Sequence, residues 1–328
     1  MIRILATPPL NTVQDLGRPG WRDIGLCQGG AMDGLALRVG NLMVGNPEDA
    51  AAIEVQTFPL RLHATADHLL AVTGADVPLR WAGAAVPAWW AMRLPAGAEL
   101  LVQRPRNGAR AYVAVAGGIA VPPVMGSRST DLRSGFGGHE GRGLQAGDEL
   151  ATGAAAPFHD GLAQDGFGVE PPTTALALDA ATDPDTITLR LLAGPDHDAF
   201  DAASRAAFWG EPWTVTAMSD RMGARLAGGT TLVRTEPREL RSGAIIPGVV
   251  QVPPSGAPLI QLRDANSAGG YPRIGVVAEA DLWRLAQAPP GARLRFLSVD
   301  HEAAVAARRR NAAYVATIRA ALAPLIAA

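Results

Sequence analysis

The pattern that decides the fold is a short apolar run ended by two glycines. It is seen in the stretch Ala111-Tyr112-Val113-Ala114-Val115-Ala116-Gly117-Gly118-Ile119. Similar runs recur about every ten residues, a spacing that is typical of short strands in all-β proteins. The 37 glycines and 26 prolines separate these runs and mark the turns between strands. The sequence therefore predicts a mainly β fold. Further strands are expected over 69–73, 99–103, 186–192, 257–262, 275–278 and 293–297.

A few helices are expected among the strands. In residues 33–44, Asp33 is a suitable N-cap, Gly45 is a suitable stop, and apolar side chains recur on one face. Three more helices are expected over 196–209, 279–286 and 301–321. The last segment is rich in alanine and arginine and is expected to pack on the surface as a terminal helix.

The length of 328 residues favours two domains, since a domain commonly has about 150 residues. Residues 151–185 are dominated by Ala, Gly, Pro, Asp and Thr without sustained periodicity, as is typical of a linker. We therefore expect one β domain over 1–150 and a second, with the terminal helix, over 186–328. Loose similarities between the halves favour two copies of one fold.

The chain contains no lysine, because all 29 basic residues are arginines. Codon bias explains this absence in a chain rich in Ala, Gly, Pro and Arg. The absence nevertheless excludes a Walker A phosphate-binding loop, a Schiff-base lysine and attachment of biotin to this chain. The net charge of −2 and the pI near 6.3 argue against a nucleic-acid partner, since nucleic-acid-binding domains usually carry a basic surplus.

The cellular location is predicted from cysteine content and apolar segments. Cys27 is the only cysteine, so no disulfide forms within the chain, which fits a reducing compartment. The first residues lack the apolar run and cleavage site of a secretory signal. No stretch reaches the roughly 18 uninterrupted apolar residues of a membrane-spanning helix. We expect a cytoplasmic protein with no membrane partner.

Motifs for metal binding and nucleophilic catalysis are absent from the sequence. The six histidines form no H-E-x-x-H motif, so no metal site is expected. No G-x-S-x-G elbow occurs, and the glycine-rich loops do not match a dinucleotide fingerprint. Ser127 lies beside Arg128 in a polar loop. Its hydroxyl is suited to binding substrate or, alternatively, to satisfying the backbone of a turn.

The densest group of polar side chains lies in residues 264–273, directly after a predicted strand. Asp264, Asn266, Tyr271 and Arg273 supply a carboxylate, an amide, a phenol and a guanidinium, at a strand end where binding groups are often placed. Arg273 is suited to hold a carboxylate through two hydrogen bonds. Asp264 is suited to act as a base or to orient an N–H group. A β-turn with an Asx cap is the alternative interpretation.

Three further arginines lie in similar loops. Arg18, Arg128 and Arg221 each stand near glycine or serine and beside an acidic residue or hydroxyl groups, with Asp220 directly before Arg221. Surface ion pairs explain most arginines of this kind, and a shared anion site is the alternative.

Several segments, taken in order, resemble one known family. They are Thr12-Val13-Gln14-Asp15-Leu16-Gly17-Arg18, Gly30-Ala31-Met32-Asp33, Asn41-Leu42-Met43-Val44-Gly45-Asn46, Tyr112-Val113-Ala114-Val115-Ala116-Gly117-Gly118-Ile119, Gly126-Ser127-Arg128-Ser129-Thr130, Ser219-Asp220-Arg221-Met222-Gly223, Gln251-Val252-Pro253-Pro254 and Gly269-Gly270-Tyr271-Pro272. The resemblance is to the biotin-dependent carboxyltransferase (allophanate hydrolase subunit 2) family. It includes the C subunit of bacterial 5-oxoprolinase, the KipA antagonist protein and the carboxyltransferase region of urea carboxylase.

The resemblance implies two tandem cyclophilin-like β-barrel domains with a cleft between them. It also implies a KipI-like protein as partner and, in 5-oxoprolinase, a further LamB/YcsF-like partner. The implied reaction is ATP-dependent opening of the 5-oxoproline lactam to glutamate, with ATP shared with or bound through the partner proteins. The alternatives are a KipA-type regulatory binding protein and a carboxyltransferase that uses carboxybiotin carried on another protein.

The resemblance also indicates site residues. The family's usual D-x-Q-T-T-G-G-Y-P-K pattern reads Asp264-Ala265-Asn266-Ser267-Ala268-Gly269-Gly270-Tyr271-Pro272-Arg273 here, so arginine replaces the lysine. Arginine keeps the charge but is a far poorer proton donor, which favours an electrostatic role. We expect Asp264, Tyr271 and Arg273 to be catalytic. The expected substrate-binding residues are Asn266, Ser127, Arg128, Asp220 and Arg221.

Overall fold

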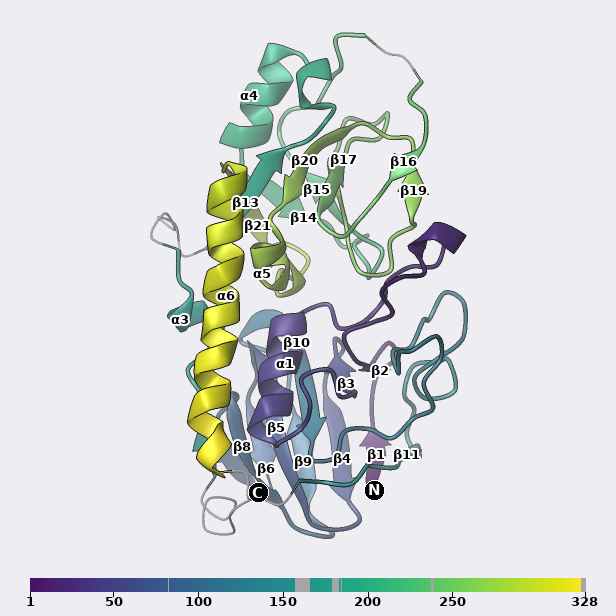
Figure 1. Cartoon of the computed structure of the whole chain (residues 1–328), viewed down its shortest axis with the longest axis vertical. Helices are drawn as coiled ribbons and strands as arrows, with labels where there is room; N and C mark the ends of the chain where they lie inside the picture. Colours follow the sequence, from purple (N-terminus) through teal and green to yellow (C-terminus); the bar gives the residue numbers. More distant parts are fainter. Residues whose placement is uncertain (82, 157–165, 179–182, 184, 237–238, 326–328) are drawn as a thin grey trace. The chain divides into compact units, whose positions relative to one another are not determined.

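The computed structural model describes residues 1–81, 83–156, 166–178, 183, 185–236 and 239–325 (Figure 1). The chain forms two compact units. Unit 1 comprises Met1–Arg18, Gly29–Ala175 and Ala313–Ala328, and unit 2 comprises Pro19–Gln28 and Leu176–Ala312. Within the predicted linker, residues 157–165, 179–182 and 184 lie outside the described residues. The boundaries at 150 and 186 stay a prediction.

The described strands of unit 1 form two six-stranded sheets. In order across the first sheet they are β11 (Glu149–Leu150), β1 (Ile2–Ala6), β4 (Leu60–Ala64), β9 (Glu99–Val102), β6 (Leu79–Trp81) and β7 (Ala84–Val86). In the second sheet they are β12 (Phe167–Gly168), β8 (Trp90–Leu94), β5 (His68–Asp76), β10 (Asn107–Val115), β3 (Ala52–Val55) and β2 (Thr12–Gln14). The apolar run over 111–115 thus lies on a central strand, β10.

One apolar core joins the two sheets of unit 1. Leu62 and Leu100 of the first sheet belong to the same buried cluster as Ile53, Val72 and Val113 of the second. Val113 pairs with Val72 on β5 and with Ile53 on β3, so three β-branched side chains lie side by side. Fully burying such a side chain stabilises a fold by about 1.5–3 kcal/mol, which explains why the central strands are apolar.

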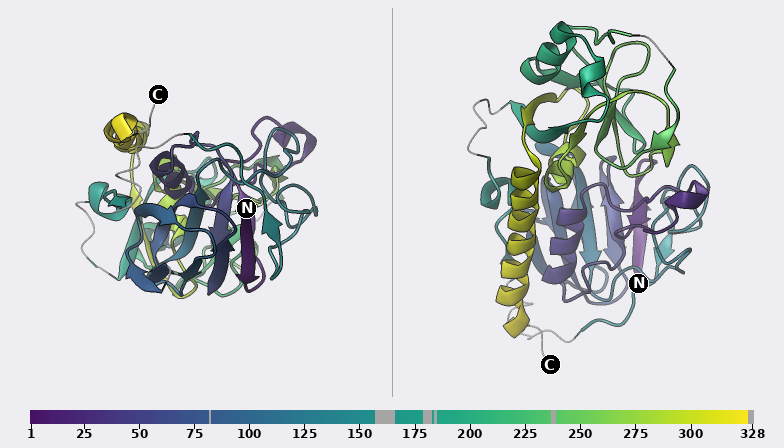
Figure 2. Two further views of the ribbon diagram at one scale, coloured as in Figure 1. Left: turned by 90° about the horizontal axis from the view of Figure 1, so that it is seen from below. Right: turned by 45° about the horizontal axis from the view of Figure 1, so that its top comes forward.

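Helix α1 (Gly34–Met43) lies against the second sheet of unit 1 (Figures 1 and 2). The predicted N-cap is confirmed, because the Asp33 side chain accepts a hydrogen bond from the Ala36 backbone N–H at 2.9 Å. Thr73 Oγ1 of β5 donates to the Ala36 carbonyl at 2.8 Å. A Cβ at Gly40 would lie 2.9 Å from Thr73 Oγ1, so glycine allows the helix to approach the sheet closely.

Unit 2 contains a closed barrel of seven described strands. Around the barrel they are β13 (Thr186–Ala193), β20 (Arg273–Val277), β17 (Val249–Gln251), β18 (Leu259–Gln261), β15 (Gly223–Ala227), β14 (Trp213–Val215) and β21 (Arg293–Ser298). The parallel pair β13–β21 closes it, with Leu189 opposite Phe296. The mainly β fold class is confirmed. Two short strands, β16 (Gly243–Ala244) and β19 (Ala268–Gly269), form a separate ribbon.

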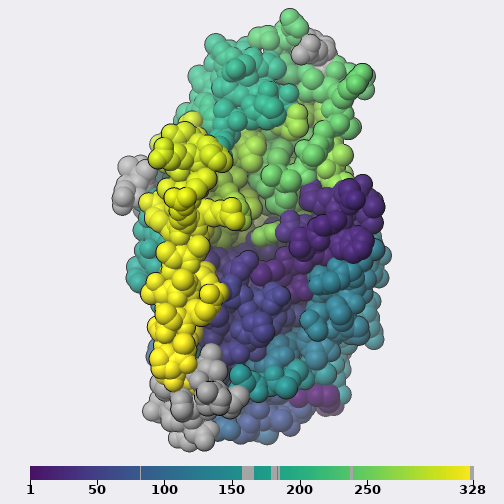
Figure 3. Space-filling model, viewed as in Figure 1, coloured from purple at the N-terminus to yellow at the C-terminus, as the bar shows by residue number. Residues whose placement is uncertain are grey.

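The remaining helices agree broadly with the sequence predictions. Residues 196–209 form η2 (His197–Ala199) followed by α4 (Ala202–Gly210), and 279–286 form η3 (Glu279–Asp281) followed by α5 (Leu282–Ala286). Smaller elements are η1 (Arg22–Ile24), α3 (Pro172–Ala175) and η4 (Ala323–Leu325). The terminal helix α6 (His301–Leu322) has mostly exposed side chains, drawn yellow in Figure 3. Among the described helices, none is both long and apolar enough to cross a membrane.

Candidate functional site

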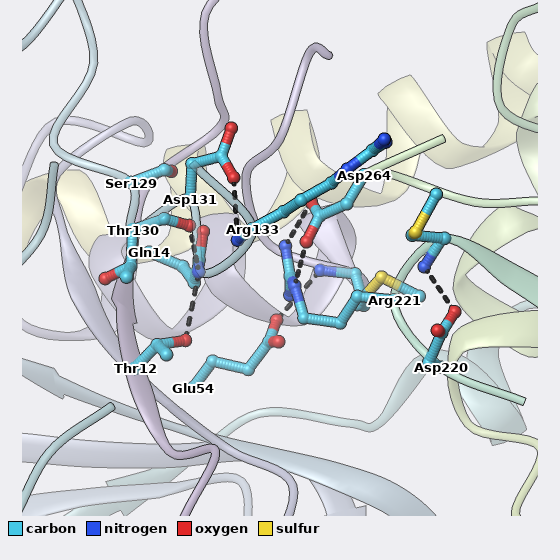
Figure 4. A network of polar contacts seen from close by, with 12 residues as sticks. Thr12, Gln14, Glu54, Ser129, Thr130, Asp131, Arg133, Asp220, Arg221 and Asp264 are labelled. Carbon is cyan, nitrogen blue, oxygen red and sulfur yellow. Dashed lines mark hydrogen bonds and ion pairs between the residues drawn. The ribbon is translucent and has the colours of Figure 1, made fainter. Parts of the chain in front are cut away.

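Asp264 and Arg221 form a buried, two-pronged ion pair in unit 2 (Figure 4). Arg221 Nε donates to Asp264 Oδ2 at 2.8 Å and Nη2 donates to Oδ1 at 3.0 Å. The side chains are only 6% and 8% exposed. Two parallel hydrogen bonds fix both planar groups in one orientation. The structure thus brings together two of the predicted site residues, which the sequence separates by 43 positions.

Asp220 shapes the turn that carries Arg221. Its Oδ1 accepts hydrogen bonds from the backbone N–H groups of Met222 at 2.8 Å and Gly223 at 3.1 Å. This is an Asx turn, in which an aspartate replaces a backbone acceptor. Asp220 is more exposed than Arg221, which is buried. Asp220 therefore sets the backbone that places the Arg221 guanidinium against Asp264.

The loop after Asp264 is fastened by a glutamine pair that sequence reasoning missed. Gln261 Nε2 donates to Gln251 Oε1 at 2.7 Å, and Gln251 Nε2 donates to the Tyr271 carbonyl at 3.2 Å. The Tyr271 side chain remains 47% exposed, and Asn266 is exposed as well. The glutamine pair thus fixes the backbone at Tyr271, while the residues Tyr271 and Asn266 are exposed.

Arg273 begins β20 and pairs with Asp196, not with Asp264. Its backbone N–H donates to Asp196 Oδ2 at 2.9 Å, and its Nε donates to the same oxygen at 3.1 Å. The Arg273 side chain is 31% exposed. The sequence predicts residue 196 only as the beginning of a helix. No local pattern marks it as a partner, because 77 positions separate it from Arg273.

In unit 1, Ser127 and Arg128 gather around the buried carboxylate of Asp15. Ser127 Oγ donates to Asp15 Oδ1 at 2.6 Å, and the Arg128 backbone N–H donates to Oδ2 at 2.5 Å. Ser129 Oγ and the Gly17 N–H donate to Oδ1 as well, at 2.5 and 2.7 Å. The Ser127 hydroxyl is thus bound to Asp15 of a distant segment, and it also accepts a hydrogen bond from the Ser129 backbone N–H at 3.0 Å, which fits the turn interpretation. The Arg128 side chain is exposed, and its Nε donates to the Val121 carbonyl at 3.0 Å.

Arg18 differs from the expected surface arginine, because it is completely buried. Its Nη2 donates to the Ser129 carbonyl at 2.5 Å, and its guanidinium carbon lies 4.8 Å from the centre of the Phe136 ring. Within the described residues, Nε and Nη1 have no hydrogen-bond partner. The surface ion-pair interpretation is therefore wrong for this residue. Its burial reflects the surrounding loops, which a sequence pattern does not reveal.

A second buried polar group in unit 1 centres on Glu54 of β3. Glu54 Oε2 accepts hydrogen bonds from the Tyr112 hydroxyl at 2.7 Å and from the Met32 N–H at 2.8 Å. Burial, followed by the negative charge of Glu54, raises the pKa of Tyr112 well above its ordinary value. Gln14 Nε2 donates nearby to Thr12 Oγ1 at 2.9 Å and to the Thr130 carbonyl at 3.1 Å. Thr12, Gln14, Tyr112 and Thr130 lie in segments that carry the family resemblance, but no role was predicted from the sequence for them or for Glu54.

The predicted site residues divide between the units. Ser127 and Arg128 lie in unit 1, and Asp220, Arg221, Asp264, Asn266, Tyr271 and Arg273 lie in unit 2. In the part of the chain that the structure describes, no group of three or more His, Cys, Asp or Glu side chains is arranged to hold a metal ion.

Sequence comparisons agree with one another. Residues 24–298 match the carboxyltransferase domain, subdomains A and B. The C subunit of 5-oxoprolinase from Escherichia coli K12 is 42% identical, over 96% of each chain. The corresponding 5-oxoprolinase C subunit of Haemophilus influenzae is 40% identical, over 97% of this chain and 98% of that one. Urea amidolyase of Lachancea kluyveri is 29% identical, over 94% of this chain and 17% of its own length.

Solved structures also resemble this chain closely, among them a urea carboxylase. Kluyveromyces lactis urea carboxylase superposes with a TM-score of 0.85 at 27% identity, over 97% of this chain and 29% of its own. TTHA0988 superposes with a TM-score of 0.74 at 34% identity, over 90% of this chain and 55% of its own. The chain therefore spans only part of these two proteins. Together with the matched segment, these similarities show that the chain belongs to the carboxyltransferase domain family, subdomains A and B.

Proposed function

We propose that this protein serves as the C subunit of an ATP-dependent 5-oxoprolinase. One observation carries the proposal, namely 42% identity to the 5-oxoprolinase C subunit of Escherichia coli over 96% of both chains. The urea amidolyase relative is less similar, at 29% identity. The substrate would be 5-oxoproline or another small cyclic amide. Opening breaks the ring C–N bond, and water supplies oxygen to the new carboxylate and a proton to the new amine.

The side chains at the start of β20 suit this chemistry. Asp264, held by Arg221, would orient or deprotonate the amide N–H group of the substrate. Arg273 would neutralise negative charge that develops on the carbonyl oxygen, and Tyr271 would donate a hydrogen bond to it. Asn266, Ser127, Arg128 and Asp220 would contribute to substrate binding directly or through the backbone.

Partner proteins are part of the proposal. A chain without lysine has no Walker A loop for ATP phosphates, so we propose that ATP is shared with or bound through a KipI-like partner. A LamB/YcsF-like protein would complete the complex. Turnover would require all three proteins, and a single cysteine suits assembly in the reducing cytoplasm.

A carboxyltransferase function is the second candidate. The observation that favours it is the TM-score of 0.85 with Kluyveromyces lactis urea carboxylase. The carboxyl group would come from carboxybiotin carried on another protein, because this chain has no lysine to which biotin could be attached. A KipA-type regulator would bind its partner and catalyse nothing.

Reconstitution tests these functions against one another. The chain is co-purified with the KipI-like protein, and the LamB/YcsF-like protein is then added. ADP and glutamate are measured with and without 5-oxoproline. The 5-oxoprolinase proposal expects ADP and glutamate to form together, and Asp264→Ala or Arg273→Ala to abolish both. Carboxyl transfer from carboxybiotin to urea would support the second function. A stable complex without either activity would leave the regulatory one.

A further inference from the structure

The guanidinium of Arg273 is hydrogen-bonded along its Nε edge. Three hydrogen bonds join residues 196 and 273. Two are those that the Arg273 backbone N–H and Nε donate to Asp196 Oδ2, and in the third the Asp196 N–H donates to the Arg273 carbonyl at 3.2 Å. Asp196 Oδ2 engages the guanidinium only through Nε. Within the described residues, Nη1 and Nη2 of Arg273 have no hydrogen-bond partner. The Arg273 side chain as a whole is 31% exposed.

Gly243 provides the space in which the guanidinium lies. A Cβ at this position would be 3.0 Å from Arg273 Nη1 and 3.5 Å from its central carbon. Gly243 is held in place through β16, where it pairs with Gly269 of β19. The absence of a side chain at Gly243 therefore leaves room for the guanidinium of Arg273.

We propose that Asp196 and Gly243 are positioning residues that direct the Nη1–Nη2 end of Arg273 toward a carboxylate on the substrate. A guanidinium offers two parallel N–H donors that match the two oxygens of a carboxylate. Asp196 occupies the Nε edge and fixes the side-chain angle, and Gly243 keeps one face clear. The substrate class is thus an anionic cyclic amide. This inference rests on the proposed function for the amide and on the geometry of unit 2 for the carboxylate.

Two probes that differ only in charge test the proposal. 5-Oxoproline carries a carboxylate, whereas 2-pyrrolidinone is the same lactam without it. Binding of each is measured by calorimetry with the assembled complex, and kcat and KM are measured for 5-oxoproline. The proposal expects Asp196→Asn and Gly243→Ala each to weaken 5-oxoproline binding and raise its KM about tenfold. The affinity for 2-pyrrolidinone is expected to remain nearly unchanged, whereas kcat for 5-oxoproline is expected to fall as well, because the same guanidinium is proposed to neutralise charge on the carbonyl oxygen.

Two further variants separate positioning from a general structural effect. Gly210→Ala is the matched control, because a Cβ there would have no atom within 4 Å, and it is expected to change neither probe's affinity. In an Arg273→Lys background, Gly243→Ala is expected to have no further effect, since the planar group that it would crowd is gone. Equal losses for both lactams, or a Gly243→Ala effect that persists with lysine, would overturn the proposal.

The same data distinguish this inference from the proposed function. If the wild-type complex binds 5-oxoproline through Arg273 but never forms glutamate, the inference stands and the hydrolase proposal fails. If glutamate forms and Asp196→Asn leaves the KM for 5-oxoproline unchanged, the hydrolase proposal stands and the positioning inference fails. If the wild-type complex binds neither lactam, both fail.

Discussion

Asp281 lies completely buried in unit 2 and accepts three hydrogen bonds from Arg190. Arg190 donates through its backbone N–H at 2.7 Å, through Nε at 2.9 Å and through Nη2 at 2.5 Å. The bonds tie η3 to the barrel strand β13, across 91 positions of sequence.

Asp281→Ala is expected to destabilise the protein strongly, since it leaves the buried Arg190 guanidinium without its partner. Breaking a buried ion pair from one side typically costs about 3–5 kcal/mol. The measurement is the free energy of unfolding in denaturant. Arg308→Ala is the control, because Arg308 and Glu279 are 72% and 70% exposed and such pairs contribute about 0–1 kcal/mol. Equal losses of unfolding free energy for the two variants would show that the buried Asp281–Arg190 pair contributes no more to stability than an exposed pair.

Asp15→Ala is expected to destabilise unit 1 because two hydroxyls and two backbone N–H groups would lose their acceptor. Each buried donor left unsatisfied costs about 1–3 kcal/mol, so the total should exceed the loss for Ser127→Ala, which removes the Ser127 Oγ donor itself. Denaturant unfolding of the two variants checks the order. A larger loss for Ser127→Ala would show that the hydroxyl, not the carboxylate, organises this loop.

Arg221→Lys is expected to reduce both stability and activity, although the charge is kept. Lysine cannot reproduce the two parallel hydrogen bonds that Arg221 gives to Asp264. Turnover of the reconstituted complex should fall at least about tenfold, because the orientation of Asp264 is lost. Thermal unfolding measured alongside separates a folding defect from an activity defect. Arg225→Lys, at an exposed position of the same unit, should behave like the wild type.

The raised pKa of Tyr112 predicts that the protein loses stability in strong alkali. Burial and the charge of Glu54 raise the pKa of its hydroxyl in the folded state. The phenol therefore ionises more readily in the unfolded chain, near pH 10. Its contribution to stability is complete below that pH and is lost as the pH rises toward the folded-state pKa. Unfolding free energies measured across this range should fall less steeply for Tyr112→Phe. An equal fall of the unfolding free energy with pH in Tyr112→Phe and the wild type would contradict the role of Tyr112 ionisation.

The pattern of the sequence was sufficient for the mainly β fold class and for several individual elements. Alternating or continuous apolar runs predicted strands such as β10 and β21, and Asp33 predicted the beginning of α1, because these signals are local. Asp264 and Arg221, which pair in the structure, had each been predicted as a site residue from the sequence of its own loop. Composition and spacing were therefore good guides wherever neighbouring residues decide the outcome.

What the sequence did not reveal depends on distant partners. Asp196 was predicted only as the beginning of a helix, yet it accepts hydrogen bonds from Arg273 across 77 positions. Asp15 binds Ser127 across 112 positions. Arg18 is buried by loops whose arrangement follows from the fold as a whole. Periodicity describes which face of an element is apolar, and it carries no information about which polar side chains meet.

The closed barrel of unit 2 also restricts how another protein can recognise it. Its seven described strands each have a hydrogen-bonded neighbour on both sides, so none offers an open edge to which a partner could add a strand. Recognition of the barrel must rely on side chains and loops. In unit 1, by contrast, the described sheets end at β2, β7, β11 and β12, and strand addition is geometrically available only at such ends.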